Sequence, residues 1–271
     1  MRTIRNVVCA VDIDDREHRA FVHALAAAAV RDARLLLVCA VPPDEPFSRR
    51  ATERLTYLWR IRAEAEARGV DVHVSVQTGE AAEIVLLHAR DRGAGLIVVS
   101  TSHGVAQGRR KGAVAEDILR GAECPTLVVR EGGHARARFA TAVCAIDMPG
   151  DSIAAEDALA VLDPREHWLT LLHVVPRNAS DTRQADALRR LQERIPEVRR
   201  GTVVAQVRRG YVLDEILELT SHAGIDLLVI GARPRASLGR RLFGITRRLL
   251  AHEGCPVLAV PAQEVRTAKA A

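Results

Sequence analysis

The feature that most constrains the fold is an internal repeat, which runs through most of the 271 residues. Three segments return in the same order and at nearly constant spacing: VVCAVD (7–12) as AVCAID (142–147), GLIVVS (95–100) as DLLVIG (226–231), and ECPTLVV (123–129) as GCPVLAV (254–260). Ordered matches of this kind indicate a duplication. We therefore predict two similar domains, at residues 1–132 and 138–264, with the glycine-containing segment 131–137 as the linker.

Within each copy, aliphatic runs alternate with amphipathic stretches. The runs predict strands at about 4–11, 34–41, 70–76, 95–100 and 125–130, and again at about 139–146, 168–175, 202–208, 226–230 and 256–260. The amphipathic stretches predict helices near 16–32, 49–68, 80–92 and 113–121, and near 152–162, 180–194, 211–222 and 240–252. Strands that alternate with helices favour right-handed crossovers and a parallel sheet. The predicted fold class is α/β, with one doubly wound, five-stranded parallel sheet in each copy.

The composition agrees with such sheets. Hydrophobic residues make up 48% of the chain and aromatic residues only 3%, so the cores are aliphatic, as in strands that are covered on both faces. No stretch approaches the roughly 18 apolar residues that cross a bilayer, and the N-terminus has no signal-peptide pattern, so we expect a cytoplasmic protein without a membrane partner. The five cysteines lie in or beside apolar runs without C-x-x-C spacing, and we interpret them as buried core residues.

In a doubly wound sheet, ligands bind beyond the carboxyl ends of the strands, where the strand order reverses. Asp12 and Asp147 end the first strand of each copy, where a carboxylate can hydrogen-bond a base or a sugar. Because both copies keep the acid there, a binding role and a structural role are equally open. Asp15 and Asp151 precede helices and are expected N-caps.

The loop after the fourth strand forms the other half of such a site. It runs from Ser100 to Gly112 in the first copy, with Gly104 inside it, and from Gly231 to Gly244 in the second. Each loop leads into a predicted helix, whose first N–H groups and positive dipole end attract phosphate.

Taken together, the repeat length, the aspartate that ends strand one, LHVV at 172–175, the glycine-bearing loop and the Cys-Pro before strand five resemble the universal stress protein family over nearly the whole chain, twice. The resemblance implies a sheet ordered 3-2-1-4-5 of the adenine nucleotide alpha hydrolase-like type and self-association through the fifth strands. It also implies, as in many members, ATP held by a G-x2-G-x9-G-[S/T] loop. The nucleotide-binding residues that we expect are Asp12, Val41, Gly104 and Gly112 in the first copy, and Asp147, Val175, Gly231, Arg233, Arg235 and Gly244 in the second.

The first loop departs from this motif. Thr101 and Gly104 fill its first two positions, only seven residues precede Gly112, and Ala113 replaces the hydroxyl residue. The loop is therefore too short to reach around a triphosphate as the whole motif does.

The second loop keeps the spacing between Gly231 and Gly244, but Pro234 replaces the middle glycine and Ile245 the hydroxyl residue. Counting back from the Cys-Pro pair instead puts Phe243 at the last glycine's position. A proline removes one N–H donor, and a lost charge-assisted hydrogen bond to phosphate costs about 1.5–3 kcal/mol. We expect ATP binding by either copy to be weak or absent.

An arginine cluster without acids lies in the second loop and the helix that follows: Arg233, Arg235, Arg240, Arg241, Arg247 and Arg248. Arg233 and Arg235 can clamp phosphate, since arginine binds it bidentately. The alternative is a solvated basic face or an ion-paired dimer surface. Nucleic acid is not an expected partner despite the net charge of +5, because basic and acidic residues are otherwise interspersed and aromatic residues are few.

The predicted second helix of the second copy is short and ends near Pro196. It therefore covers less of the pocket side of that copy, and the two copies need not have the same function. We interpret His173 as a core or pocket-edge residue and His103 as an incidental loop residue.

The sequence predicts a non-catalytic stress-response regulator that binds an adenine nucleotide weakly or not at all. The alternatives are a dimerising interaction scaffold without nucleotide and, with no catalytic motif in support, a weak ATP-hydrolysing enzyme. The fifth strands, 125–130 and 256–260, are predicted to pair within one chain or between chains.

Overall fold

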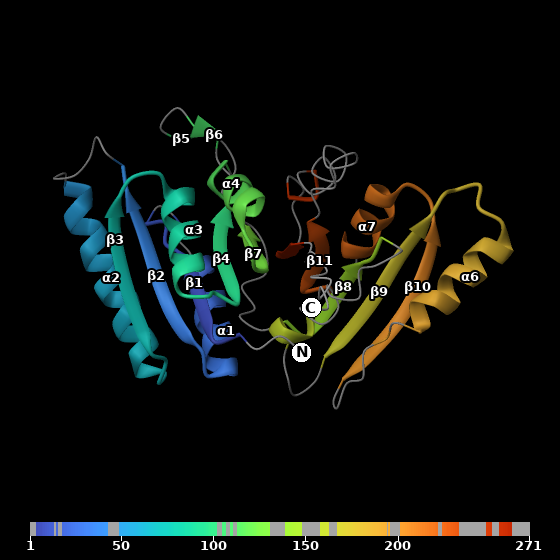
Figure 1. Ribbon diagram of the computed structural model, residues 1–271, viewed down its shortest axis with the longest axis horizontal. Coiled ribbons are helices and arrows are strands. Elements are labelled where there is room, and N and C mark those ends of the chain that lie inside the picture. The colour runs from blue at the N-terminus through green and yellow to red at the C-terminus, as the bar shows by residue number, and fades with distance from the viewer. Residues whose placement is uncertain are drawn as a thin grey trace, which may run out of the picture.

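One continuous ten-stranded sheet runs through the molecule (Figure 1). The computed structural model describes residues 4–13, 15, 18–42, 49–101, 105–106, 109–110, 113–130, 139–147, 158–162, 167–193, 195, 201–221, 224–232, 248–250 and 255–261. The strands of the first half are β1 (Asn6–Ala10), β2 (Arg34–Val41), β3 (Val72–Thr78), β4 (Leu96–Thr101) and β7 (Thr126–Arg130). Those of the second half are β8 (Thr141–Ala145), β9 (Trp168–Val175), β10 (Thr202–Arg209), β11 (Leu227–Ala232) and β12 (Val257–Pro261).

The order across the sheet is β10-β9-β8-β11-β12-β7-β4-β1-β2-β3. Each half thus has the strand order 3-2-1-4-5, and all its neighbouring strands are parallel. The predicted α/β class is confirmed, with a doubly wound, parallel five-stranded arrangement in each half, and the two arrangements join into one ten-stranded sheet.

The two halves meet at their fifth strands. β12 pairs with β7 antiparallel, with Val257 opposite Val128, Leu258 opposite Leu127 and Ala259 opposite Thr126. The predicted pairing of these strands is therefore present within the chain. The division into separate domains at 1–132 and 138–264 stays a prediction, and the expected linker lies outside the described residues.

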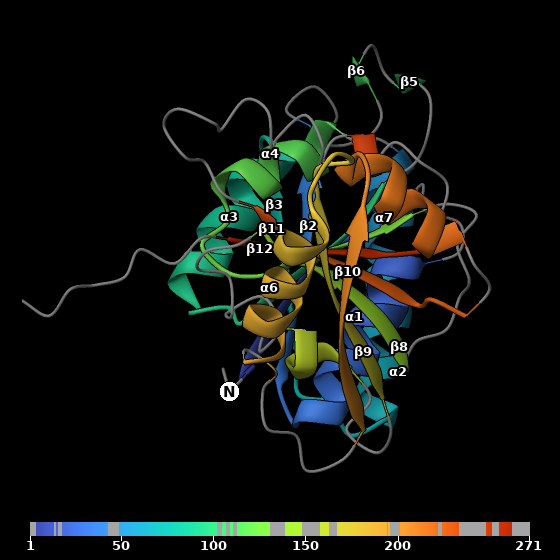
Figure 2. The same ribbon diagram turned by 90° about the vertical axis from the view of Figure 1, so that its right-hand side faces the viewer.

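Helices cover both faces of the sheet (Figures 1 and 2). They are α1 (Arg19–Arg31), α2 (Arg49–Ala67), α3 (Ala81–Asp91), α4 (Ala113–Gly121), α6 (Asp181–Gln192) and α7 (Val212–Ser221). Side chains of α1, α2 and α6 join one core, and those of α3, α4 and α7 join the other. Of the helices within the described part of the chain, none is both long and apolar enough to span a bilayer.

Alternation along the strands fills these two cores. In β1, Val7 and Cys9 belong to the core under α1, while Val8 and Ala10 belong to the core under α3. Burying such side chains stabilises the fold by roughly 1.5–3 kcal/mol for each Val or Leu. All five cysteines are free thiols and none is exposed, as the sequence predicts.

The duplication is also visible in single backbone hydrogen bonds. Past β1, the N–H of Val11 donates to Val38 O at 2.8 Å; past β8, the N–H of Ile146 donates to Leu172 O, also at 2.8 Å. The two halves thus shape the carboxyl edge of the sheet in the same way. They differ in the helix after the second strand, which has 19 residues in α2 but 12 in α6, as expected from Pro196.

Candidate functional site

Four of the predicted site residues lie at the carboxyl edge of the sheet. Asp12 and Asp147 follow β1 and β8 by two residues and are exposed, while Val41 and Val175 end β2 and β9 and are buried. The carbonyl groups of the two valines accept equivalent bonds, from Gly79 N–H at 2.9 Å and from a second glycine, at the end of β10, at 3.1 Å.

The remaining predicted residues belong to the loops after the fourth strands. Gly231 lies within β11, opposite Val260 of β12. Gly104, Gly112, Arg233, Arg235 and Gly244 lie outside the described residues, as does His103. Their roles stay predictions.

Part of the first loop forms a two-stranded antiparallel sheet that was not predicted from the sequence. β5 (Val105–Ala106) pairs with β6 (Arg109–Arg110), and Figure 1 places this pair above the carboxyl edge of the sheet. The signal that could have predicted it is the connecting dipeptide Gln107-Gly108, because glycine favours two-residue hairpin connections.

In the first half, side chains of α2 pack beside Asp12. Arg54 is buried, with 6% of its surface exposed, and its charge lowers the pKa of the Cys39 thiol, which burial raises more strongly. Tyr57 is half-buried, and its pKa is raised by burial and then by the charges of Cys9 and Asp15. Two side chains of α2 thus lie at or below the surface of the first half in this region.

His18 completes this cluster. It precedes α1 in a left-handed conformation, with φ of 52°, and its ring centroid lies 4.6 Å from that of Tyr57. Its Nε2 accepts a hydrogen bond from Arg60 at 2.7 Å. The expected N-cap Asp15 is not the residue at the N-cap position, which is His18, because α1 begins only at Arg19; the Asp15 carboxylate nevertheless accepts from the N–H of Arg19 at 3.0 Å.

The second half has a cavity of about 560 Å³ at the equivalent place. Asp147, His173 and Val175 line it from the strand ends, and α6 contributes the charged side chains Arg183 and Arg190. Asp186, Thr182 and Ser180 complete the polar part of its wall. The cavity therefore brings together two of the residues that the sequence assigned to the nucleotide site.

His173 in β9 has the position that Cys39 has in β2. Leu171 of β9 is opposite Cys144 of β8, as Leu37 of β2 is opposite Cys9 of β1, and His173 and Cys39 each lie two residues beyond that leucine. The Nδ1 atom of His173 lies 2.8 Å from the carbonyl oxygen of Ile146 and must donate to it. In the neutral ring Nε2 is then a hydrogen-bond acceptor. The interpretation of His173 as a core or pocket-edge residue agrees with this position, at the edge of the cavity.

Charges alternate around the cavity. Arg183 and Arg190 are seven residues apart on α6 and so share one face of the helix, with Asp186 between them. Ser180 caps the helix by accepting from the N–H of Arg183 at 3.2 Å. Among the residues that the structure describes, no three His, Cys, Asp or Glu side chains gather as a metal site would require.

The universal stress protein family model matches this chain twice, at residues 3–130 and 139–261. The chain is also similar to solved structures. A universal stress protein from Archaeoglobus fulgidus is 15% identical with a TM-score of 0.72, over 94% of this chain and 98% of that one. A putative universal stress protein from Pseudomonas aeruginosa is 18% identical with a TM-score of 0.69, over 95% and 93%. No curated protein matches the chain.

Proposed function

Because the chain belongs to the universal stress protein family, as a tandem of two family units, we propose that it is a non-catalytic stress-response regulator whose ligand site lies in the second half. The observation that carries this proposal is the cavity of about 560 Å³ beside Asp147, His173 and Val175. In the first half, α2 instead contributes the buried Arg54 and the partly buried Tyr57. The ligand that we propose is an adenine nucleotide.

The wall of the cavity supports such a ligand. Asp147 is exposed at the carboxyl end of β8, where its carboxylate can accept from a base amino group or a ribose hydroxyl. His173 offers Nε2 as an acceptor, because Nδ1 is held by Ile146 O. Arg183 and Arg190 supply positive charge for a phosphate.

We propose that binding is weak and sensitive to salt. The second loop has Pro234 and Ile245 where the whole motif has a glycine and a hydroxyl residue, so fewer donors can surround a triphosphate. Arg233 and Arg235 would then hold the phosphates by charge, without a shaped cradle of backbone N–H groups. Attraction of this kind is screened by salt when the charges face solvent.

The test compares two matched variants, Asp147→Ala and Asp12→Ala, which remove the same carboxylate from the two halves. Calorimetry with ATP should give one site per chain, weakened about tenfold or more by Asp147→Ala and unchanged by Asp12→Ala. Mass spectrometry of the denatured protein should detect a co-purified adenine nucleotide in the wild type at higher occupancy than in Asp147→Ala. Equal binding by wild type and Asp147→Ala, or loss only in Asp12→Ala, would overturn the proposal.

A second candidate is an interaction scaffold without nucleotide, and the strand pairing bears on it. β7 and β12 pair with each other within the chain, and each has a second neighbour in the sheet, so neither has an unpaired edge for a strand of a second chain. The strands at the two ends of the sheet are β10 and β3. A scaffold that recruits partners by strand addition would therefore use these outer edges.

A further inference from the structure

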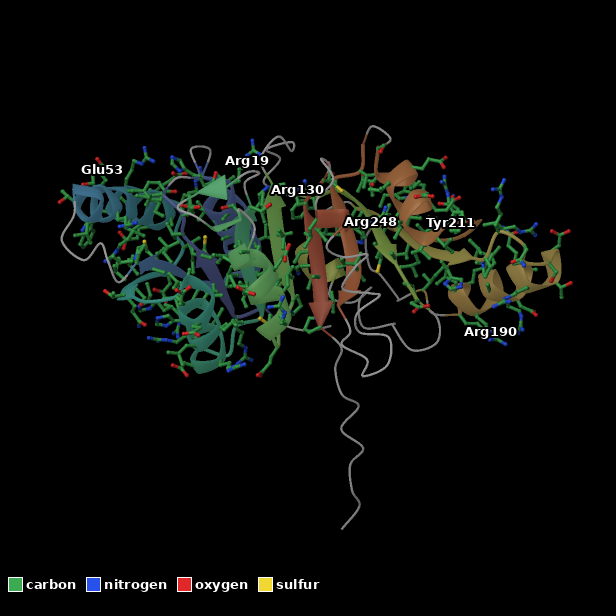
Figure 3. All side chains as sticks on the ribbon, turned by 90° about the horizontal axis from the view of Figure 1, so that it is seen from above. Arg19, Glu53, Arg130, Arg190, Tyr211 and Arg248 are labelled. Atoms are coloured by element: carbon green, nitrogen blue, oxygen red, sulfur yellow. The ribbon has the colours of Figure 1, made fainter. Side chains whose placement is uncertain are left out.

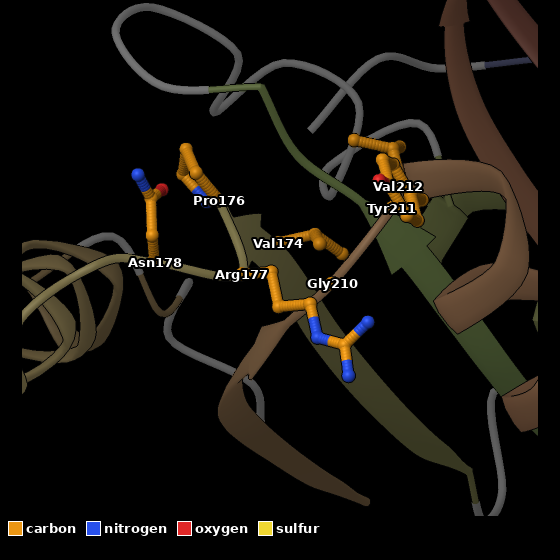
Figure 4. Close-up of a pocket in the computed structure, with 7 residues that line it drawn as sticks. All are labelled: Val174, Pro176, Arg177, Asn178, Gly210, Tyr211 and Val212. Atoms are coloured by element: carbon orange, nitrogen blue, oxygen red, sulfur yellow. The ribbon is translucent and has the colours of Figure 1, made fainter.

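A second cavity, of about 550 Å³, lies beside the carboxyl ends of β9 and β10 on the side of α7. It is lined by Val174, Pro176, Arg177, Asn178, Gly210, Tyr211 and Val212. Figure 4 shows Arg177 and Asn178 on the side of the β9–α6 turn, Tyr211 and Val212 on the side of the β10–α7 turn, and Val174 between them. This cavity does not use Asp147, His173 or Val175 and is distinct from the proposed nucleotide site, although both touch Val174 and Pro176.

The polar side chains that line this cavity make no hydrogen bond or ion pair with the rest of the described structure. Within the described part of the chain, the guanidinium of Arg177 has no carboxylate partner, and the side chains of Asn178 and Tyr211 have no hydrogen-bond partner. The arginines of the neighbouring strand differ: Arg208 lies 3.3 Å from Glu215, and Arg209 is paired with Asp181. Arg177 is exposed, and among the described residues no carboxylate neutralises its charge.

The apolar groups are unusually exposed. Tyr211 has 70% of its surface exposed and Val212 has 43%, in a chain with only two tyrosines. Together with Val174 and Pro176 they give the cavity an apolar wall with few polar groups, which is the usual composition of a small-molecule site. A tyrosine ring with one open face offers a stacking surface for a planar ring.

The charges around the cavity set the orientation of a ligand. The first turn of α7 carries Asp214 and Glu215, and Arg177 is the one cationic side chain among the residues that line the cavity. Figure 4 shows the Arg177 side chain extending below Gly210, away from Tyr211 and Val212, and an anion is favoured beside its guanidinium. A ligand that satisfies both ends has a flat ring against Tyr211 and a negative group toward Arg177.

We propose that this cavity binds a small aromatic anion, meaning a planar ring system of one or two rings that carries a carboxylate, sulfonate or phosphate. A volume of about 550 Å³ accommodates such a molecule. Arg177 pairs with the anionic group, Tyr211 stacks on the ring, and Asn178 donates to or accepts from a ring substituent.

The experiment titrates the full chain with 2-naphthoate, a fluorescent bicyclic carboxylate, and with its neutral amide, 2-naphthamide. The wild type should bind the carboxylate about tenfold more tightly than the amide, and Arg177→Gln should abolish this difference. Tyr211→Ala should weaken both compounds at least about fivefold, whereas Tyr211→Phe, which keeps the ring, should not. Titration with 2-naphthyl phosphate and AMP then shows which anionic group and ring the site prefers.

Two control variants separate this site from the proposed nucleotide site. Arg183→Ala and Asp147→Ala alter only the first cavity and should leave 2-naphthoate binding unchanged, whatever they do to ATP. The substituted side chains Arg177 and Tyr211 are exposed, so circular dichroism should show all variants folded. Absence of 2-naphthoate binding at about 1 mM, equal binding by Arg177→Gln and wild type, or loss only in Asp147→Ala would each overturn the proposal.

Discussion

The Nη1 atom of Arg130 donates a hydrogen bond to the carbonyl oxygen of Leu249 at 3.1 Å, and so joins the last strand of the first half to a helical segment of the second. Arg130 ends β7 and has only 2% of its surface exposed. Its carbonyl oxygen in turn accepts a hydrogen bond from Arg19 of α1. Figure 3 places Arg19 and Arg130 next to the seam between β7 and β12. One buried arginine thus links three elements across the two halves.

Replacing this arginine by alanine should destabilise the protein. Arg130→Ala removes a buried charged donor, leaves the Leu249 carbonyl without it and creates a cavity. We expect a loss of about 2–4 kcal/mol in the free energy of unfolding, measured by urea denaturation. Arg120→Ala is the matched control, since Arg120 is exposed on α4 and pairs with Asp117 at the surface. It should change the free energy by less than about 0.5 kcal/mol, and a similar effect of both variants would contradict the account.

The stability of the seam should depend on pH through His23. This residue is 2% exposed and stacks on Phe139 of the second half, with ring centroids 5.1 Å apart. Burial, and then the charge of Arg19, lowers the pKa of His23 from 6.5 to about 4. Between pH 4 and pH 6.5 the His23 side chain binds a proton in the unfolded chain but not in the folded chain. The free energy of unfolding therefore decreases as the pH falls from about 6.5 toward 4.

The measurement for His23 compares urea unfolding at neutral pH and near pH 4.5. The wild type should lose about 2–3 kcal/mol more stability over this interval than His23→Gln, whose side chain does not titrate. Identical pH profiles of wild type and variant would mean that His23 is protonated at the same pH in both states.

The cysteine thiols should react slowly in the native protein. Burial raises the pKa of Cys255 to about 11, and it also raises the pKa values of Cys9 and Cys39. Because the thiolate is the reactive form, a disulfide reagent at pH 8 should modify these residues at least about a hundredfold more slowly than free cysteine. In urea all five thiols should react at once. A native thiol that reacts at the rate of free cysteine would contradict this burial.

The pairing of the fifth strands can be tested by a double-mutant cycle. Leu127 and Leu258 are opposite residues in β7 and β12, and both are fully buried. Leu127→Ala and Leu258→Ala should be coupled by about 0.5 kcal/mol or more in the free energy of unfolding. Leu35 of β2 lies three strands from β7 in the sheet, so Leu127→Ala and Leu35→Ala should be additive. Additivity in the first pair as well would argue against the internal seam.

The strands could be predicted from the sequence because burial on both faces demands aliphatic runs, and the repeat supplied each signal twice. Their order came from the resemblance to the universal stress protein family, since aliphatic runs do not show which strands are neighbours. Boundaries were less accurate where burial continues beyond the ladder. Val70 is buried but precedes β3, and Phe139 makes only an isolated bridge with Leu162 ahead of β8. Aliphatic composition marks burial and does not mark where strand pairing begins.

The candidate site was only partly predictable. Asp147 and Val175 could be placed at strand ends, since the repeat aligns them with Asp12 and Val41. Which side chains line each strand end depends on a different element, such as α6, which contributes Arg183 and Arg190 to the cavity of the second half. The pattern of an amphipathic helix shows which side chains face inward, but not which space at the edge of the sheet they fill. Exposed residues such as Arg177 and Tyr211 carry no periodic signal at all.

We propose that the second half binds an adenine nucleotide by charge, at a site whose phosphate loop lacks a glycine and a hydroxyl residue of the family motif. Calorimetry with ATP at low and moderate salt, on the wild type and on the double variant Arg233→Ala, Arg235→Ala, tests it most directly. The account predicts an affinity weaker than micromolar that falls about tenfold or more with added salt and again in the double variant. Sub-micromolar binding that neither salt nor the double variant changes would contradict it, and would mean that a complete phosphate cradle is present.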